Sequence, residues 1–191
     1  MQNQHYALVA YVRHPVGEFV ENLRRELHPD LPHLPAHLTI LPPRCLIGME
    51  NSQPQVAESI ALDTLSEVCR NVDPFEIVLG DVETFVPVTP TVFLRVAKAA
   101  YRMRELHDRL NSGIFHCEEQ WPYMPHLTIV KMAAEDQALR AFQVARQRWK
   151  EYSGSPRVII EELTFVREGE DNTWVDLKPI PLGRTLVPGG R

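Results

Sequence analysis

The sequence predicts a mixed α and β fold in which two sheet-bearing lobes, related by an approximate twofold axis, face a single site. The first observation is a repeat: the tetrapeptide His-Leu-Thr-Ile occurs at residues 37–40 and again at residues 126–129. Repeated segments indicate a duplicated structural unit. The second observation is that strand-like and helix-like segments alternate along the 191 residues with no long linker. We therefore expect residues 1–191 to form a single bilobal domain.

The elements before and within the first repeat follow from periodicity and from proline. Residues 5–13 are rich in Val and Tyr and predict a strand, and apolar residues at helical spacing predict a helix over residues 16–28. Several prolines within residues 29–35 predict an extended connector to the first repeat. We expect Pro42 and Pro43 to end the strand that carries this repeat.

A helix and two strands are predicted after the first repeat. Residues 45–54 predict a loop, and residues 74–86 and 91–96 predict two strands, the first with a bulge at Gly80. In the second of these strands, alternation places Thr91, Phe93 and Arg95 on one face. The helix before them should have one face formed by Ala57, Ile60, Ala61, Thr64, Leu65 and Val68.

The last part of the chain predicts two more helices and three strands. A helix over residues 99–112 should end with Gly113 as its C-cap. The second repeat predicts a strand that Lys131 closes. A helix then begins near residues 135–136, whose acidic side chains suit a helix N-terminus. Residues 158–167 and 173–180 predict two final strands, and the Pro- and Gly-rich segment from Pro181 predicts a flexible tail.

Composition excludes several classes of protein. A net charge of −5 argues against a strongly basic nucleic-acid-binding protein. The three cysteines are Cys45, Cys69 and Cys117, and they form no Cys-x-x-Cys pair, so we expect neither a disulfide framework nor a zinc site. No basic-then-apolar leader and no apolar run of membrane length is present. We expect a cytoplasmic monomer without membrane association.

Each repeat offers an imidazole and a hydroxyl side by side. In a strand, residues two apart point to the same face, so His37 lies beside Thr39 and His126 beside Thr128, while the Leu and Ile residues point into a core. Two such strands brought together can perform acid–base chemistry on a phosphate without a metal. The alternative is two buried strands whose histidines are hydrogen-bonded core residues.

These residues resemble the 2H phosphoesterase superfamily, which contains the 2′-5′ RNA ligase-like proteins and the RNA 2′,3′-cyclic phosphodiesterases. Two motifs of His-x-Thr/Ser followed by an apolar residue carry the resemblance, together with residues 75–80, Phe85 and 92–96, which are similar to the family's middle strand pair. It covers roughly residues 5–180. It departs at residues 42–44, where Pro-Pro-Arg stands in place of the aromatic residue of better-studied members.

The resemblance implies a bilobal fold of two antiparallel-sheet lobes with flanking helices. It also implies a reaction without metal or other cofactor, on the 2′,3′-cyclic phosphates of RNA ends or of small nucleotides. His126 would be the base and His37 the acid, and Thr39 and Thr128 would bind the non-bridging oxygens. Candidate substrate contacts are Tyr123, Arg44 and Lys131; a packed aromatic and a solvated loop cation are the competing interpretations of the first two.

Three other functions remain open at this point. The same chemistry in reverse is 2′-5′ RNA ligation. A non-catalytic nucleotide-binding module could use the same cleft, although binding alone would not need an acid–base pair. A metallohydrolase is less favoured, because the eight histidines include no His-x-His or His-Glu-x-x-His.

Overall fold

The computed structural model describes residues 4–13, 15–30, 35–170 and 173–183. Within them one antiparallel sheet of eight strands has the order β6-β3-β4-β5-β2-β1-β7-β8. The strands are β1 (Tyr6–Tyr11), β2 (His37–Arg44), β3 (Phe75–Thr84), β4 (Thr91–Lys98), β5 (His126–Lys131), β6 (Arg157–Ile160), β7 (Glu162–Glu168) and β8 (Trp174–Pro181). The helices are α1 (Val16–Leu27), α2 (Pro54–Arg70), α3 (Ala100–Leu110) and α4 (Glu135–Glu151), with a short 3₁₀ turn at Gly113–Phe115.

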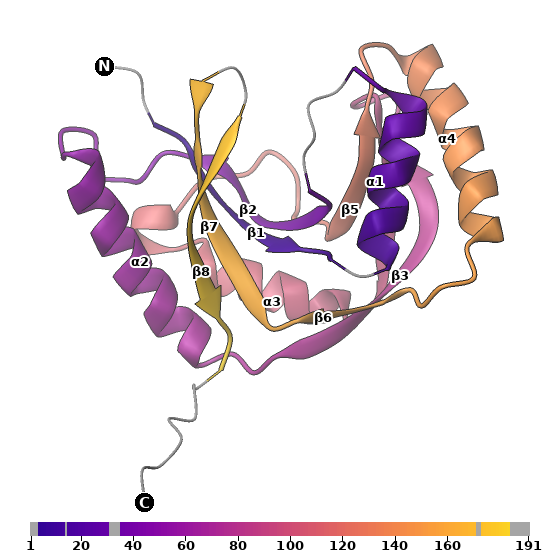
Figure 1. Cartoon of the computed structure of the whole chain (residues 1–191). Helices are drawn as coiled ribbons and strands as arrows, with labels where there is room; N and C mark the ends of the chain where they lie inside the picture. The colour runs from indigo at the N-terminus through magenta and orange to yellow at the C-terminus, as the bar shows by residue number, and fades with distance from the viewer. Residues whose placement is uncertain (1–3, 14, 31–34, 171–172, 184–191) are drawn as a thin grey trace, which may run out of the picture.

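The sheet consists of two four-stranded halves that meet at the strands carrying the repeats. Between β2 and β5 the ladder contains a single pair, Leu38 opposite Leu127, whereas other neighbouring strands pair over four or more positions. The predicted α+β fold with two antiparallel halves is therefore confirmed, and the halves form one curled sheet joined at its centre. Figure 1 shows the halves opening away from this junction.

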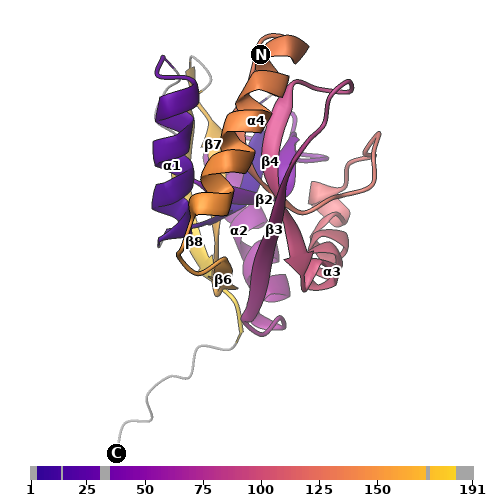
Figure 2. The ribbon, with the colours of Figure 1, turned by 90° about the vertical axis from the view of Figure 1, so that its right-hand side faces the viewer.

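The helices are exchanged between the halves. The helix α1 follows β1 but packs against β5 and α4, and α3 follows β4 but packs against β2 and α2. Figure 2 shows α1 and α4 side by side, and α4 also packs against β3 and β4. Because each half is covered partly by a helix from the other, the halves cannot separate without exposing core residues.

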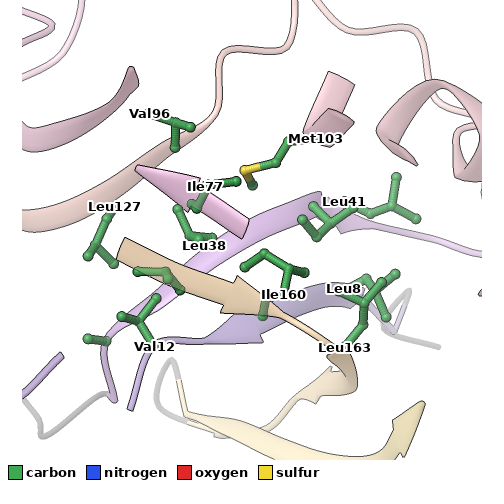
Figure 3. Close-up of a cluster of buried hydrophobic side chains, with 14 of the residues drawn as sticks. Leu8, Val12, Leu38, Leu41, Ile77, Val96, Met103, Leu127, Ile160 and Leu163 are labelled. Atoms are coloured by element: carbon green, nitrogen blue, oxygen red, sulfur yellow. The ribbon is translucent and has the colours of Figure 1, made fainter. Parts of the chain in front are cut away.

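The two repeats have the same local structure. Both begin with the burial pattern half-buried, buried, half-buried, buried, buried over their first five residues. The register of β2 against β1 shifts by one residue at Ile40, and the register of β5 against β4 shifts by one residue at Ile129. Each strand therefore has a β-bulge directly after its threonine. Leu38 and Leu127 are fully buried and point into the core, as Figure 3 shows.

Most predicted elements are confirmed, but the segment 158–167 is two strands and not one. The chain breaks at Glu161, because β6 pairs with β3 while β7 pairs with β1 in the other half. Alternation identifies extended chain but does not say which neighbour it pairs with. The bulge predicted near Gly80 is confirmed, since the register of β3 against β4 shifts between Leu79 and Val82.

Pro42 and Pro43 do not end the first repeat strand, and that prediction was wrong. The strand continues to Arg44, which pairs with Tyr6. Proline lacks an N–H, and this is tolerated where a strand is irregular or open on one side. Both conditions hold, because the register of β2 is shifted between Leu41 and Arg44, and its pairing with β5 contains only Leu38.

Three smaller predictions need correction. Ile60 is exposed, and the buried stripe of α2 is Ala57, Ala61, Leu65 and Cys69. The C-cap of α3 is Asn111, while Gly113 has a φ of +55° and begins the 3₁₀ turn. The expected tail does not begin at Pro181: Leu182 is buried and the Gly183 N–H donates to the carbonyl of Cys69. Residues 184–191 and residues 31–34 of the connector lie outside the described residues.

Candidate active site

The side chains of the two repeats meet at the centre of the sheet. Since Leu38 lies opposite Leu127, continuing the antiparallel register by one residue places His37 alongside Thr128 and Thr39 alongside His126. The two leucines point into the core, so the four polar side chains lie on the opposite face. All four are half-buried. The sheet thus presents two imidazoles and two hydroxyls in a compact, approximately twofold arrangement.

The two imidazoles are held in the same way. The Nδ1 of His37 lies 2.8 Å from the carbonyl oxygen of Pro35, and the Nδ1 of His126 lies 2.7 Å from that of Met124. A carbonyl oxygen can only accept a hydrogen bond, so each Nδ1 carries the proton. In the neutral imidazole this leaves a lone pair on Nε2, which can accept a proton and release it again.

Burial lowers the pKa of both imidazoles below the ordinary value for histidine. For each, loss of hydration is the largest cause, and the hydrogen bond to the backbone carbonyl acts in the opposite direction. The pKa of His37 is lowered further by the positive charge of Arg24 and by that of His126. A positive charge on His126 therefore disfavours a positive charge on His37.

The reactive groups of the site have no protein partner within the described part of the chain. No hydrogen bond within the protein reaches the Nε2 of His37 or His126 or the hydroxyls of Thr39 and Thr128. Every fully buried side-chain N or O atom of the described residues does have a partner, so these four groups are not fully buried. Groups of this kind are available to a ligand. Two nitrogens that exchange protons and two hydroxyl donors suit a tetrahedral oxyanion such as a phosphodiester.

Aromatic and apolar side chains surround this centre on both sides. A hollow of about 110 Å³ adjoins His37 and Thr39, and its wall is formed by Ala7, Val9, Tyr11, Pro43, Val166 and Trp174. On the other side, Phe85 and Phe93 each lie 5.1 Å from the His126 ring, measured between centroids, in edge-to-face geometry. The site is therefore partly shielded from water, which strengthens hydrogen bonds to a charged ligand.

The three candidate substrate contacts lie in different surroundings. Lys131 is exposed. Because the bulge adds one residue to β5, the side chain of Lys131 points to the same face of the sheet as that of His126. Tyr123 stacks on His107 with 4.1 Å between centroids and donates its hydroxyl to the carbonyl of Thr39 at 2.7 Å. Burial raises the pKa of Tyr123.

Arg44 is not a solvated loop residue, and that interpretation was wrong. Its side chain is 3% exposed and forms an ion pair with Glu119 at 2.7 Å. It also donates to the Asn111 side chain and to the carbonyls of Pro42 and Phe115. The segment around residues 111–119 folds over the end of β2 and encloses the guanidinium, a long-range contact that the sequence does not reveal.

Sequence reasoning did not single out several residues that border the site. Tyr11 and Arg95 pair across the sheet with His37 and His126 respectively, so they occupy equivalent positions in the two halves. Arg95 is largely exposed and lies 3.3 Å from Glu83. The sequence does give one indication for Arg95, because alternation places its side chain on the same face of the strand as Phe93. Nothing in the sequence connects Trp174 to His37, since β8 reaches the site only through β7 and β1.

The described residues lack two features that would indicate other classes of protein. No group of three or more His, Cys, Asp or Glu side chains there is arranged to hold a metal ion. No helix in that part of the chain combines the length and the apolar character needed to cross a membrane.

Curated relatives match nearly the whole chain. A provisionally named phosphoesterase of Halalkalibacterium halodurans is 23% identical over 179 residues, covering 94% of this chain and 98% of its own. One from Oceanobacillus iheyensis is 22% identical over 182 residues with the same coverage, and one from Bacillus thuringiensis is 25% identical over 178 residues, covering 93% and 96%. The matches extend over nearly all of both sequences in each case.

Solved structures show the same fold. Escherichia coli LigT in its apo form has a TM-score of 0.61 at 14% identity, covering 94% of this chain and 98% of its own. The complex of LigT with 3′-AMP has a TM-score of 0.59 at 15% identity, with coverages of 95% and 99%. The protein TT0787 of Thermus thermophilus gives 0.57 at 15% identity, with coverages of 95% and 100%.

A family model settles the relationship that the repeated motif and the fold both indicate. The model of the 2′-5′ RNA ligase superfamily matches residues 12–172, which include both His-Leu-Thr-Ile strands and the helices that cover them. Family and fold support a phosphoesterase or 2′-5′ ligase-like enzyme. The chain belongs to the 2′-5′ RNA ligase superfamily, as the resemblance predicted.

Proposed function

We propose that the protein is a metal-independent phosphodiesterase that opens 2′,3′-cyclic phosphates of RNA ends or of small nucleotides. The observation that carries the proposal is the set of four groups without a protein partner, two imidazole Nε2 atoms and two threonine hydroxyls, on strands joined at Leu38 and Leu127. Hydrolysis of a cyclic phosphate needs a base for water, an acid for the departing ribose oxygen and donors for the non-bridging oxygens. The set meets each of these needs.

The resemblance implies that His126 is the base and His37 the acid, and the tautomer that the backbone imposes on both leaves Nε2 as the reacting atom of each. With Nδ1 protonated, neutral His126 accepts a proton from water at Nε2 as the water oxygen bonds to phosphorus. His37, protonated on both nitrogens, gives its Nε2 proton to the 2′ or 3′ oxygen as the bond from that oxygen to phosphorus breaks. Thr39 and Thr128 donate to the non-bridging oxygens, where negative charge increases. Proton exchange with solvent then restores the starting states.

The surroundings of the site suggest how a nucleotide would lie. We place the nucleoside against the apolar hollow beside His37, where Trp174 and Tyr11 offer aromatic surface. Lys131 and Arg95 would attract the phosphate from the exposed side. Arg44 is left out of the contacts, because its guanidinium is buried and paired. Related LigT structures contain 3′-AMP, ATP, NADP⁺ or phosphate, which supports a nucleotide-like substrate.

The test of this function is product analysis in ¹⁸O-labelled water. The substrates are a panel of 2′,3′-cyclic mononucleotides, short RNAs with a cyclic end, and an ADP-ribose cyclic phosphate. Mass spectrometry should show a linear phosphate carrying one ¹⁸O. If every member of the panel is recovered unchanged at high enzyme concentration, the proposal is wrong.

The family model also favours 2′-5′ RNA ligation as a second candidate. In ligation a 5′-hydroxyl replaces water as the nucleophile on the same cyclic phosphate, so His126 would again be the base and His37 the acid; the roles exchange only when the cyclic phosphate is re-formed. Adding an oligonucleotide with a free 5′-hydroxyl to the same assay distinguishes the two, because ligation gives a longer product without ¹⁸O. A non-catalytic nucleotide-binding module would give neither product.

Removal of metal ions should leave the activity unchanged. The base, the acid and both oxyanion donors are side chains of the protein, so no step requires a metal-bound water. We expect the rate of cyclic phosphate opening after exhaustive treatment with EDTA to equal that of untreated enzyme. Loss of turnover in EDTA that returns on addition of zinc or manganese would contradict the mechanism.

The pH dependence of kcat/KM should be a bell centred below pH ~6.5, the ordinary pKa of histidine. Only the state with one neutral and one protonated imidazole reacts. Its population is greatest midway between the two macroscopic pKa values, and burial lowers both. A bound phosphate anion favours the imidazolium, so the bell for kcat should lie at higher pH than the bell for kcat/KM. A profile flat from about pH 5 to 9 would require other catalytic groups.

A further inference from the structure

The two β-bulges leave backbone carbonyls without partners in the ladder, and side chains from the other half of the sheet donate hydrogen bonds to them. A bulge leaves one residue outside the regular ladder, so its backbone groups need other partners. The bulges lie at Ile40 and Ile129, and β2 and β5 pair with each other only at the preceding leucines. The carbonyls of the threonine and the isoleucine in each repeat are therefore left for side-chain donors.

In the second repeat a single guanidinium supplies both hydrogen bonds. Arg24 of α1 donates from Nε to the carbonyl of Ile129 at 2.9 Å and from Nη2 to the carbonyl of Thr128 at 3.0 Å. The same helix also holds the first repeat. The carboxylate of Glu21, one turn earlier, accepts from the N–H of Ala36, the residue before His37, at 3.1 Å.

In the first repeat two rings supply the equivalent hydrogen bonds. The hydroxyl of Tyr123 donates to the carbonyl of Thr39 at 2.7 Å, and the Nδ1–H of His107 donates to the carbonyl of Ile40 at 2.8 Å. The rings stack face to face with 4.1 Å between centroids. The Nε2 of His107 lies 3.3 Å from Glu119, which also pairs with Arg44. Through Glu119, Arg44 thus helps to hold His107 and Tyr123 in place.

We propose that Arg24 on one side, and Tyr123 with His107 on the other, are positioning residues that hold the two bulges and thereby aim Thr128 and Thr39 at the phosphate. The inference rests on the proposed function, because it concerns the alignment of that catalytic set. We call Arg24 one clamp and the pair Tyr123 and His107 the other. Each clamp crosses from one half of the sheet to the other, since Arg24 lies between β1 and β2 but holds β5, and Tyr123 precedes β5 but holds β2. The clamps therefore fix the two catalytic strands relative to each other.

The first test is a pair of single substitutions with matched controls. Tyr123→Phe removes one hydroxyl, and Arg24→Met removes both guanidinium donors but keeps an apolar stem. Each should lower kcat about tenfold to a hundredfold, the effect of a small misalignment, while KM changes less than about threefold. Arg24→Lys, which can reach one carbonyl, should recover part of the loss. The controls are Tyr152→Phe, whose hydroxyl donates to the carbonyl of Ser155 far from the site, and Arg25→Met on the exposed side of α1.

A double-mutant cycle separates positioning from general destabilisation. If Tyr123 acts through Thr39, the effect of Tyr123→Phe should shrink to less than about threefold in a Thr39→Val background and persist in a Thr128→Val background. Arg24→Met should show the opposite dependence. Loss of stability alone would give the same fold-change in both backgrounds, and that result, or two fully active variants, would overturn the inference.

A binding measurement keeps the inference testable if the wild type has no turnover. In that case the proposed function fails, and inorganic phosphate is titrated against the imidazole resonances of His37 and His126 by ¹⁵N NMR. Arg24→Met and Tyr123→Phe should each shift these resonances and weaken phosphate binding severalfold relative to Arg25→Met and Tyr152→Phe. Unchanged resonances and an unchanged Kd would overturn the clamp without reference to catalysis.

Discussion

Replacing either His37 or His126 by Ala should lower kcat by a factor of about 10² to 10⁴, while the double variant should fall far short of the product of the two single effects. Each histidine has the same backbone partner two residues earlier, the same tautomer and the same place in its bulged strand. Proton donation and proton removal belong to one transition state. Once one group is missing, the second has less left to contribute.

The measurement is kcat on whichever cyclic phosphate the wild type opens, with the free energy of unfolding determined for each variant. His116→Ala is the matched control, because His116 is exposed and not part of the site. The single variants should fold, since both imidazoles are half-buried on the face of the sheet away from the core and, within the described residues, no hydrogen bond of the protein depends on their Nε2 atoms. A folded His37→Ala or His126→Ala protein with nearly full activity would refute the two-histidine mechanism.

Removing the hydroxyl of Thr39 or Thr128 should lower kcat by about 10² to 10³, the range measured for loss of one oxyanion donor. The substitution is Thr→Val, which keeps the β-branched shape and the strand preference but removes the donor. If the two hydroxyls bind different oxygens of the phosphate, the effects of Thr39→Val and Thr128→Val should multiply. This distinguishes them from the histidines, whose effects should not.

Serine provides the control at both threonine positions. Thr39→Ser and Thr128→Ser retain the hydroxyl and should keep kcat within about tenfold of the wild-type value, less than the loss expected when an oxyanion donor is removed. Equal losses for Val and Ser would indicate that packing and not hydrogen bonding matters at these positions. Full activity in the Thr39,Thr128→Val double variant would contradict the assigned role of the hydroxyls.

The sequence by itself determined much of the local structure and the identity of the candidate site. The repeated His-Leu-Thr-Ile places imidazole and hydroxyl on one face of any strand, because side chains alternate with a period of two. The strand and helix segments, the bulge near Gly80 and the buried leucines follow from the same periodicity and from glycine. Each of these properties depends on residues close together in the chain, so neighbouring residues are enough to predict it.

Tertiary structure alone decided how the site is built and supported. The separation of β6 from β7, the continuation of β2 through Pro42 and Pro43, and the burial of Arg44 depend on which distant segment lies alongside. The same holds for the hydrogen bonds from Arg24 to β5 and from Tyr123 to β2, which join residues 105 and 84 positions apart in the chain. Lone arginines and tyrosines carry no periodic signal. Their partners are fixed by the exchange of helices between the two halves, which brings unpaired backbone carbonyls within reach of their donors.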